Sequence, residues 1–131
     1  MFHSESLAKL ALRLTVGILL LFHGIDKIIN PSSIEGIGRN LTDFNLPYFL
    51  SYGVYLGEVL APLMIIIGLK TRAGAFIIAI NMVFAILLFH SHQLLQTNNH
   101  GGWTLELQGL YLIGAVVIFL QGSGKYAVRP S

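Results

Sequence analysis

The chain has 131 residues, of which 54% are hydrophobic and 11% are charged, and its net charge is +2. Soluble domains carry about 25% charged residues, so this composition excludes an ordinary soluble protein and predicts an integral membrane protein. The absence of cysteine excludes thiolate metal sites and dithiol chemistry within the chain. The basic residues form no run of the kind that binds nucleic acid, and we expect no nucleic-acid partner.

Four apolar runs follow one another, and about 20 apolar residues are needed to cross the hydrocarbon core of a bilayer. We predict membrane spans at about 7–28, 48–69, 74–95 and 103–120, which together form a single domain over 1–131. Asn30-Pro31 ends the first span, since proline disfavours helix in the residue before it. Pro47 opens the second. The predicted fold is all-α, an antiparallel four-helix bundle within the membrane.

The segment between the first two spans is too polar to cross. Its apolar residues nevertheless recur at helical spacing, at Ile34, Ile37, Leu41 and Phe44. This pattern predicts a short amphipathic helix that lies in the membrane interface.

The distribution of lysine and arginine predicts the orientation, because cytoplasmic loops are enriched in these residues. With the N-terminus inside, only Lys27 and Arg39 fall outside. The inner side then holds Lys9, Arg13, Lys70, Arg72, Lys125 and Arg129. We therefore expect a multi-pass protein of a prokaryotic plasma membrane, with both termini in the cytoplasm.

Several ionisable residues lie inside the predicted spans. Such groups cost roughly 2.5–3.5 kcal/mol each at membrane depth and rarely face lipid. We therefore predict a buried polar cluster that is a candidate ligand-binding site, made of Arg13, His23, Lys27, Glu58, His90 and Glu106. Depth along the helices allows Glu58 to pair with Arg13 or Lys27, and His23 to pair with Glu106 or His90. The sequence does not choose between these pairs.

Glu58 is the least expected of these residues, because it lies near the middle of the second span. Pro62, four residues later, has no N–H to donate to the Glu58 carbonyl, so the helix should bend there. Asn81, in the third span, fits an interhelical hydrogen bond. His92 and His100 fit solvated loops. No catalytic motif is present, we predict no metal site, and catalytic residues stay unassigned.

The order and spacing of these residues resemble the DoxX family of small four-helix membrane proteins. The first span carries R-x9-H-G-x2-K from Arg13 to Lys27, and the second carries Gly57-Glu58 followed by A-P-L-x4-G-L-x-x-R. Residues 85–90, Glu106 and the terminal segment 122–126 also match. Ser123 and Ala127 depart from the usual terminal motif.

The resemblance implies a membrane subunit of a quinone-linked oxidoreductase system, or of a redox-stress complex. The cofactor stays unassigned, with quinone as one candidate, and the chain carries no electron-transfer motif of its own. Two other classes fit the residues: a small-solute or proton-coupled transporter, for which Glu58 and Pro62 are suited, and a structural or assembly subunit. Whether the protein is an enzyme is left open.

The expected partners are the lipid bilayer and either a soluble redox protein or further copies of the chain. Gly109 and Gly114 in the fourth span favour a homo-oligomer, because glycine lets helices approach closely.

Overall fold

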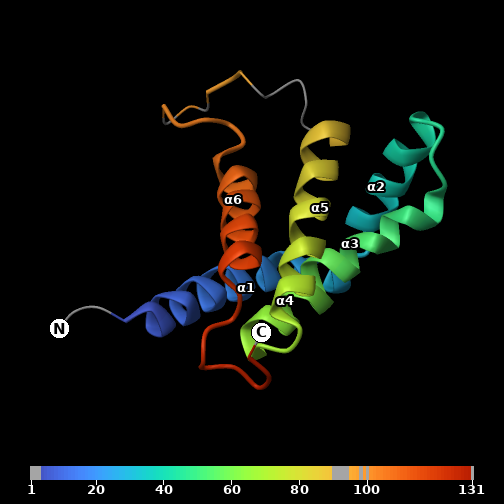
Figure 1. Ribbon diagram of the computed structural model, residues 1–131. Coiled ribbons are helices and arrows are strands. Elements are labelled where there is room, and N and C mark those ends of the chain that lie inside the picture. The colour runs from blue at the N-terminus through green and yellow to red at the C-terminus, as the bar shows by residue number, and fades with distance from the viewer. Residues whose placement is uncertain (1–3, 90–94, 98, 100, 131) are drawn as a thin grey trace.

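A computed structural model describes residues 4–89, 95–97, 99 and 101–130. Within these residues the protein is all-α, apart from an isolated β-bridge between Thr97 and Trp103. In chain order the elements are α1 (Glu5–Ile29), α2 (Ser32–Asp43), η1 (Tyr48–Tyr52), α3 (Gly53–Tyr55), η2 (Leu56–Leu60), α4 (Ala61–Ile67), α5 (Thr71–Phe89) and α6 (Glu106–Gln121). In Figure 1, α5 and α6 stand side by side, α1 and α4 run across their lower ends, and α2 projects beyond α5.

The first helix extends slightly beyond the predicted span 7–28. It begins after Ser4, whose side chain accepts a hydrogen bond from the Leu7 N–H at 3.2 Å, a common N-terminal cap. It ends where the Asn30 N–H donates to the Asp26 carbonyl, directly before Pro31. The predicted helix between the first two spans is present as α2, which buries Ile34 and Leu41.

The predicted second span, 48–69, is a continuous helical segment built from four successive elements with three helical geometries. It starts as a 3₁₀ turn (η1), passes through α3 and the π-turn η2, and continues as α4. It ends two residues early, because Gly68 adopts the left-handed conformation (φ 80°). The N–H groups of Gly68 and Leu69 then both donate to the Met64 carbonyl, which closes the helix.

The last two helices are displaced from their predicted limits. α5 begins at Thr71 rather than 74, and the predicted end at 95 lies beyond residues 90–94, which the structure does not describe. α6 begins at Glu106 rather than 103, because Trp103 pairs with Thr97 in the isolated bridge.

Two of the described helical stretches are long and apolar enough to cross a membrane by themselves. These are Glu5–Ile29 and Tyr48–Ile67; the apolar stretches Thr71–Leu87 and Glu106–Gln121 are shorter. The all-α fold is therefore confirmed, whereas the four-helix membrane bundle stays a prediction.

One apolar core joins the long helices. α1 contributes Val16 and Leu20, and the other helices contribute Ala61, Ile65, Ala75, Ile78, Met82, Tyr111, Ala115 and Ile118. Many large apolar side chains point outward instead, including Phe22, Leu110 and Leu120. An outer surface of this kind suits lipid, which covers apolar side chains at no cost.

Candidate ligand-binding site

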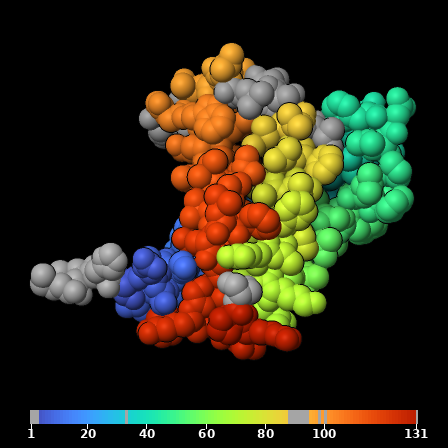
Figure 2. Space-filling model, viewed as in Figure 1, coloured from blue at the N-terminus to red at the C-terminus, as the bar shows by residue number. Residues whose placement is uncertain are grey.

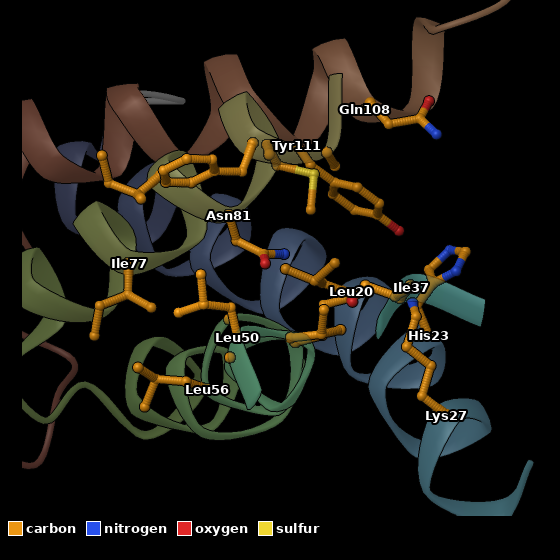
Figure 3. Close-up of a pocket in the computed structure, with 18 of the residues that line it drawn as sticks. Leu20, His23, Lys27, Ile37, Leu50, Leu56, Ile77, Asn81, Gln108 and Tyr111 are labelled. Atoms are coloured by element: carbon orange, nitrogen blue, oxygen red, sulfur yellow. The ribbon is translucent and has the colours of Figure 1, made fainter. Parts of the chain in front are cut away.

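A cavity of about 710 Å³ lies between α1, α2, the second span, α5 and α6. Its size is within the range of small-molecule sites. The apolar part of its lining includes Leu20, Ile37, Leu41, Leu50, Leu56, Phe76, Ile77, Ile80, Met82, Phe84 and Leu107. The polar part consists of His23, Lys27, Asn40, Glu58, Asn81, Gln108 and Tyr111. Figure 3 shows several of these side chains directed into the space between the helices.

The π-turn places Glu58 in the wall of this cavity. Because Pro62 has no N–H, the Glu58 carbonyl lacks its usual helical donor. The backbone widens one turn before the proline, and the Ala61 N–H donates to the Leu56 carbonyl, five residues back. The disturbance that the sequence predicts as a bend at Pro62 is therefore a π-turn centred on Glu58. Such turns are frequent at functional sites.

Two glycines allow the neighbouring helices to approach this turn. A Cβ atom on Gly24 of α1 would overlap the backbone carbonyl of Glu58. A Cβ atom on Gly57 would lie 2.6 Å from the Cβ of Asn81 on α5. The turn is thus held between α1 and α5, and the Glu58 side chain is buried.

Glu58 forms an ion pair with Lys27 across the cavity wall. Lys27 Nζ lies 2.8 Å from Glu58 Oε1, with side chains that are 19% and 9% exposed, respectively. The Tyr55 hydroxyl donates to the Lys27 backbone carbonyl at 3.2 Å, which fixes the end of α1 against the second span. Of the two partners that the sequence allows for Glu58, the structure selects Lys27. The pair is neutral as a unit.

His23 lies against Tyr111 rather than beside an acidic residue. The two rings meet edge to face, with centroids 5.9 Å apart and planes at 83°. Figure 3 shows the Tyr111 side chain directed toward His23, with Gln108 nearby. Sequence reasoning missed both residues on α6. The sequence signal for them is their spacing of three residues, which places both side chains on the same face of a helix.

Arg13 lies away from this cavity. Its side chain is 1% exposed, and all its described partners are backbone carbonyls. Nε donates to Ile65 at 2.9 Å and Nη2 to Ile66 at 3.3 Å, at the C-terminal end of α4. Nη1 donates to Ser123 at 2.9 Å and Tyr126 at 2.7 Å. A cation is favourable at a helix C-terminus, so the arrangement indicates a structural role for Arg13.

The other two predicted residues are not in the described cavity. Glu106 is exposed at the first position of α6 and does not line the cavity. His90 lies outside the described residues, as do His92 and His100. Asn81, for which the sequence predicts an interhelical hydrogen bond, lines the cavity.

The fold and site define a class of small helical membrane proteins with a mainly apolar cavity. A family model described as DoxX matches residues 8–91, more than half of the chain. The protein therefore belongs to the DoxX family, as the motifs predict, and it is a membrane protein.

Similar proteins add little about the activity. A protein of Haemophilus influenzae, described as uncharacterized, is 30% identical over 121 residues. The match covers 89% of this chain and 84% of that relative. No solved structure matches the chain.

Proposed function

We propose that this DoxX-family protein binds a quinone in the cavity between its helices and is a membrane subunit of a quinone-linked oxidoreductase system. The observation that supports this proposal is the composition of the cavity. Its walls are mostly apolar, while ionisable and hydrogen-bonding side chains gather where Lys27, Glu58 and Tyr111 line it. An isoprenoid quinone is divided in the same way, since its polar ring would suit the polar side chains of the cavity and its apolar tail would suit the apolar walls.

The charge of the cavity favours a neutral headgroup. Lys27 and Glu58 neutralise each other at 2.8 Å, so an anionic headgroup would gain little attraction and would lose its hydration. A quinone ring is uncharged and offers two carbonyl oxygens. Lysine, tyrosine, glutamine and histidine side chains can donate hydrogen bonds to such oxygens.

Electrons must reach a bound quinone from outside this chain. Its sequence contains no cysteine and therefore no thiolate-bound iron–sulfur centre. A soluble redox protein or a reduced substrate is the proposed source. The chain's own residues hold the ring and exchange its protons.

The proposed setting is a prokaryotic plasma membrane with both termini in the cytoplasm. In this arrangement α5 and α6 complete a four-helix bundle with the two longer spans. Reporter fusions after Arg39 and after Ser131 test the topology. We expect Arg39 to be outside and Ser131 inside, and an external C-terminus would contradict the proposal.

The quinone proposal is tested by mass spectrometry of the protein after gentle extraction. We expect quinone to co-purify with the unmodified chain. In the variants Glu58→Gln and Tyr111→Phe the amount of co-purified quinone should fall at least tenfold, which corresponds to roughly 1.4 kcal/mol of binding free energy. Glu106→Gln is the matched control, since Glu106 is an exposed carboxyl outside the cavity. Equal quinone in all four proteins would contradict a site in this cavity.

A transporter is the second candidate, and the π-turn at Glu58 favours it. Membrane transporters build their substrate sites at interrupted helices, and here the interruption holds a carboxylate paired with lysine. Proteoliposome uptake separates the two functions. Solute or proton uptake that Glu58→Gln abolishes, with no quinone bound to the unmodified protein, would overturn the quinone proposal in favour of transport.

A further inference from the structure

Five basic residues lie on the segments at the end of the molecule where α1 begins and α4 ends. We call them the basic collar: Lys9, Lys70, Arg72, Lys125 and Arg129. They come from three segments that are distant in sequence. Figure 2 shows these segments meeting, with the red C-terminal segment beneath the blue start of α1 and the yellow-green end of α4.

Backbone hydrogen bonds and Arg13 hold the three segments together. The Val128 N–H donates to the Ile67 carbonyl at 3.0 Å, and the Arg129 N–H donates to Gly68 at 3.1 Å. These hydrogen bonds hold the backbone of Arg129 beside the turn that contains Lys70. Gly124 lies against Lys9, because a Cβ there would be 3.3 Å from the Lys9 Cβ. The Arg13 guanidinium bridges α4 and the C-terminal segment.

The collar carries a concentrated positive charge. Among the described residues, none of its five cations forms an ion pair with a carboxylate. Four of them are exposed and Lys9 is half-exposed. Among the described acidic side chains, only that of Glu5 is at this end, since the others lie on the second half of α1, on α2, on η2 and at the start of α6. The molecule is therefore electrically asymmetric.

Apolar side chains border the collar on the same segments. Leu7 is 54% exposed, Leu120 71% and Val128 72%. Tyr126 is also exposed, and Lys125 Nζ lies 5.2 Å from the centre of its ring. Cations beside exposed aliphatic and tyrosine side chains match the boundary between lipid headgroups and acyl chains.

We propose that the basic collar is a binding site for anionic phospholipids. The lysines and arginines meet the phosphodiester headgroup, and Leu7, Leu120 and Val128 contact the acyl chains. The site lies at the opposite end of α1 from Lys27, and the proposal does not depend on what fills the cavity. A lipid bound here would join α1, α4 and the C-terminal segment, in addition to Arg13.

The test is native mass spectrometry of the purified full-length protein, titrated with phosphatidylglycerol or phosphatidylethanolamine of identical acyl chains. We expect phosphatidylglycerol to bind more tightly. Each basic residue near an anionic lipid surface contributes about a fivefold effect on binding. The affinity of the double variant Lys70→Gln/Arg129→Gln for phosphatidylglycerol should therefore fall roughly 25-fold. Arg39→Gln is the matched control, because Arg39 is exposed on α2, away from the collar. This variant should bind phosphatidylglycerol as tightly as the unmodified protein does.

A second arm separates the lipid from a free anion. Inorganic phosphate at millimolar concentration should not displace phosphatidylglycerol. Displacement by phosphate, or equal binding of the two lipids, would overturn the proposal. Unchanged binding in Lys70→Gln/Arg129→Gln would also overturn it. Circular dichroism of each variant identifies loss of fold. If the double variant is unfolded, the single variants Lys125→Gln and Arg72→Gln are tested instead. The affinity of each for phosphatidylglycerol should fall about fivefold, and unchanged affinity would overturn the proposal.

Discussion

Arg13 and Glu58 are both buried ionisable residues in apolar helices, yet their side chains have different kinds of partner. Glu58 meets an opposite charge, Lys27, in the wall of a cavity. Arg13 meets carbonyl oxygens at the end of a helix. Arginine suits this second role because its planar group presents five donors in a fixed geometry. We therefore expect a substitution of Arg13 to change the stability of the protein and a substitution of Glu58 to change ligand binding in the cavity.

Arg13→Lys should destabilise the protein although it keeps the charge. Lysine has three donors on a flexible chain and cannot reach all four carbonyls that Arg13 binds. Leaving buried carbonyls without a partner costs about 1–3 kcal/mol each, so we expect a loss of roughly 2–4 kcal/mol. Denaturation in mild detergent measures it. Arg39→Lys, at an exposed position, is the control, and equal effects of the two changes would contradict the role given to Arg13.

Gly24→Ala should separate α1 from the π-turn. The added methyl group would overlap the Glu58 carbonyl oxygen, which is backbone and cannot rotate away. Overpacking of this kind costs about 1–3 kcal/mol. Gly36→Ala on α2 is the control, since nothing lies within 4 Å of the new Cβ, and there alanine should stabilise the helix by about 0.5–1 kcal/mol. The same denaturation measurement should show changes of opposite sign.

At the scale of the element, the second span shows how one proline reshapes a helix. Pro62 removes a backbone donor, and the preceding turn takes up the change as a π-turn. An extra residue in a turn rotates the residues before it by about 100° relative to a regular helix. This rotation is the physical reason that Glu58 can lie in the cavity wall beside Lys27.

Pro62→Ala should therefore remove the site without removing the helix. Alanine restores the N–H that the Glu58 carbonyl lacks, and a regular α-helix becomes available. We expect unchanged or higher helicity by circular dichroism, together with at least a tenfold loss of co-purified quinone. Pro47→Ala provides the comparison, because Pro47 is the N-cap of η1, where the missing N–H of proline removes no helical hydrogen bond. Retention of quinone by Pro62→Ala would show that the π-turn is not required.

At the scale of the whole molecule, the C-terminal segment closes one end of the protein. It donates to Ile67 and Gly68 and supplies two of the carbonyls that Arg13 binds. The glycines of α6 are used within the chain as well. A Cβ on Gly114 would lie 2.8 Å from Val16, and one on Gly109 would lie 2.7 Å from the Trp103 ring. These contacts account for both glycines within one chain, and the homo-oligomer stays a prediction.

Removal of residues 123–131 should lower the stability and couple to Arg13. The truncated chain keeps only the two α4 carbonyls as partners for Arg13. We expect truncation and Arg13→Lys to be non-additive when combined, with a coupling of about 0.5–3 kcal/mol, because both remove the same contacts. A double-mutant cycle in detergent measures this value. Strict additivity would show that the two features act independently.

The sequence by itself determined the all-α class, the membrane setting, the approximate helix limits and the DoxX family. Apolar runs, prolines and short motifs are local signals, and they need no knowledge of packing. Glu58 also stands out in the sequence, since a carboxyl near the middle of an apolar span requires a partner.

Only the tertiary structure decided which partners the ionisable residues take. Glu58 and Lys27 are 31 residues apart, and Arg13 reaches carbonyls 110 and 113 residues away. Every residue carries a carbonyl, so nothing in the sequence marks those of Ser123 and Tyr126 as partners of Arg13. The contact of His23 with Tyr111, and the cavity that both line, likewise depend on how α1 and α6 pack, which local signals do not specify.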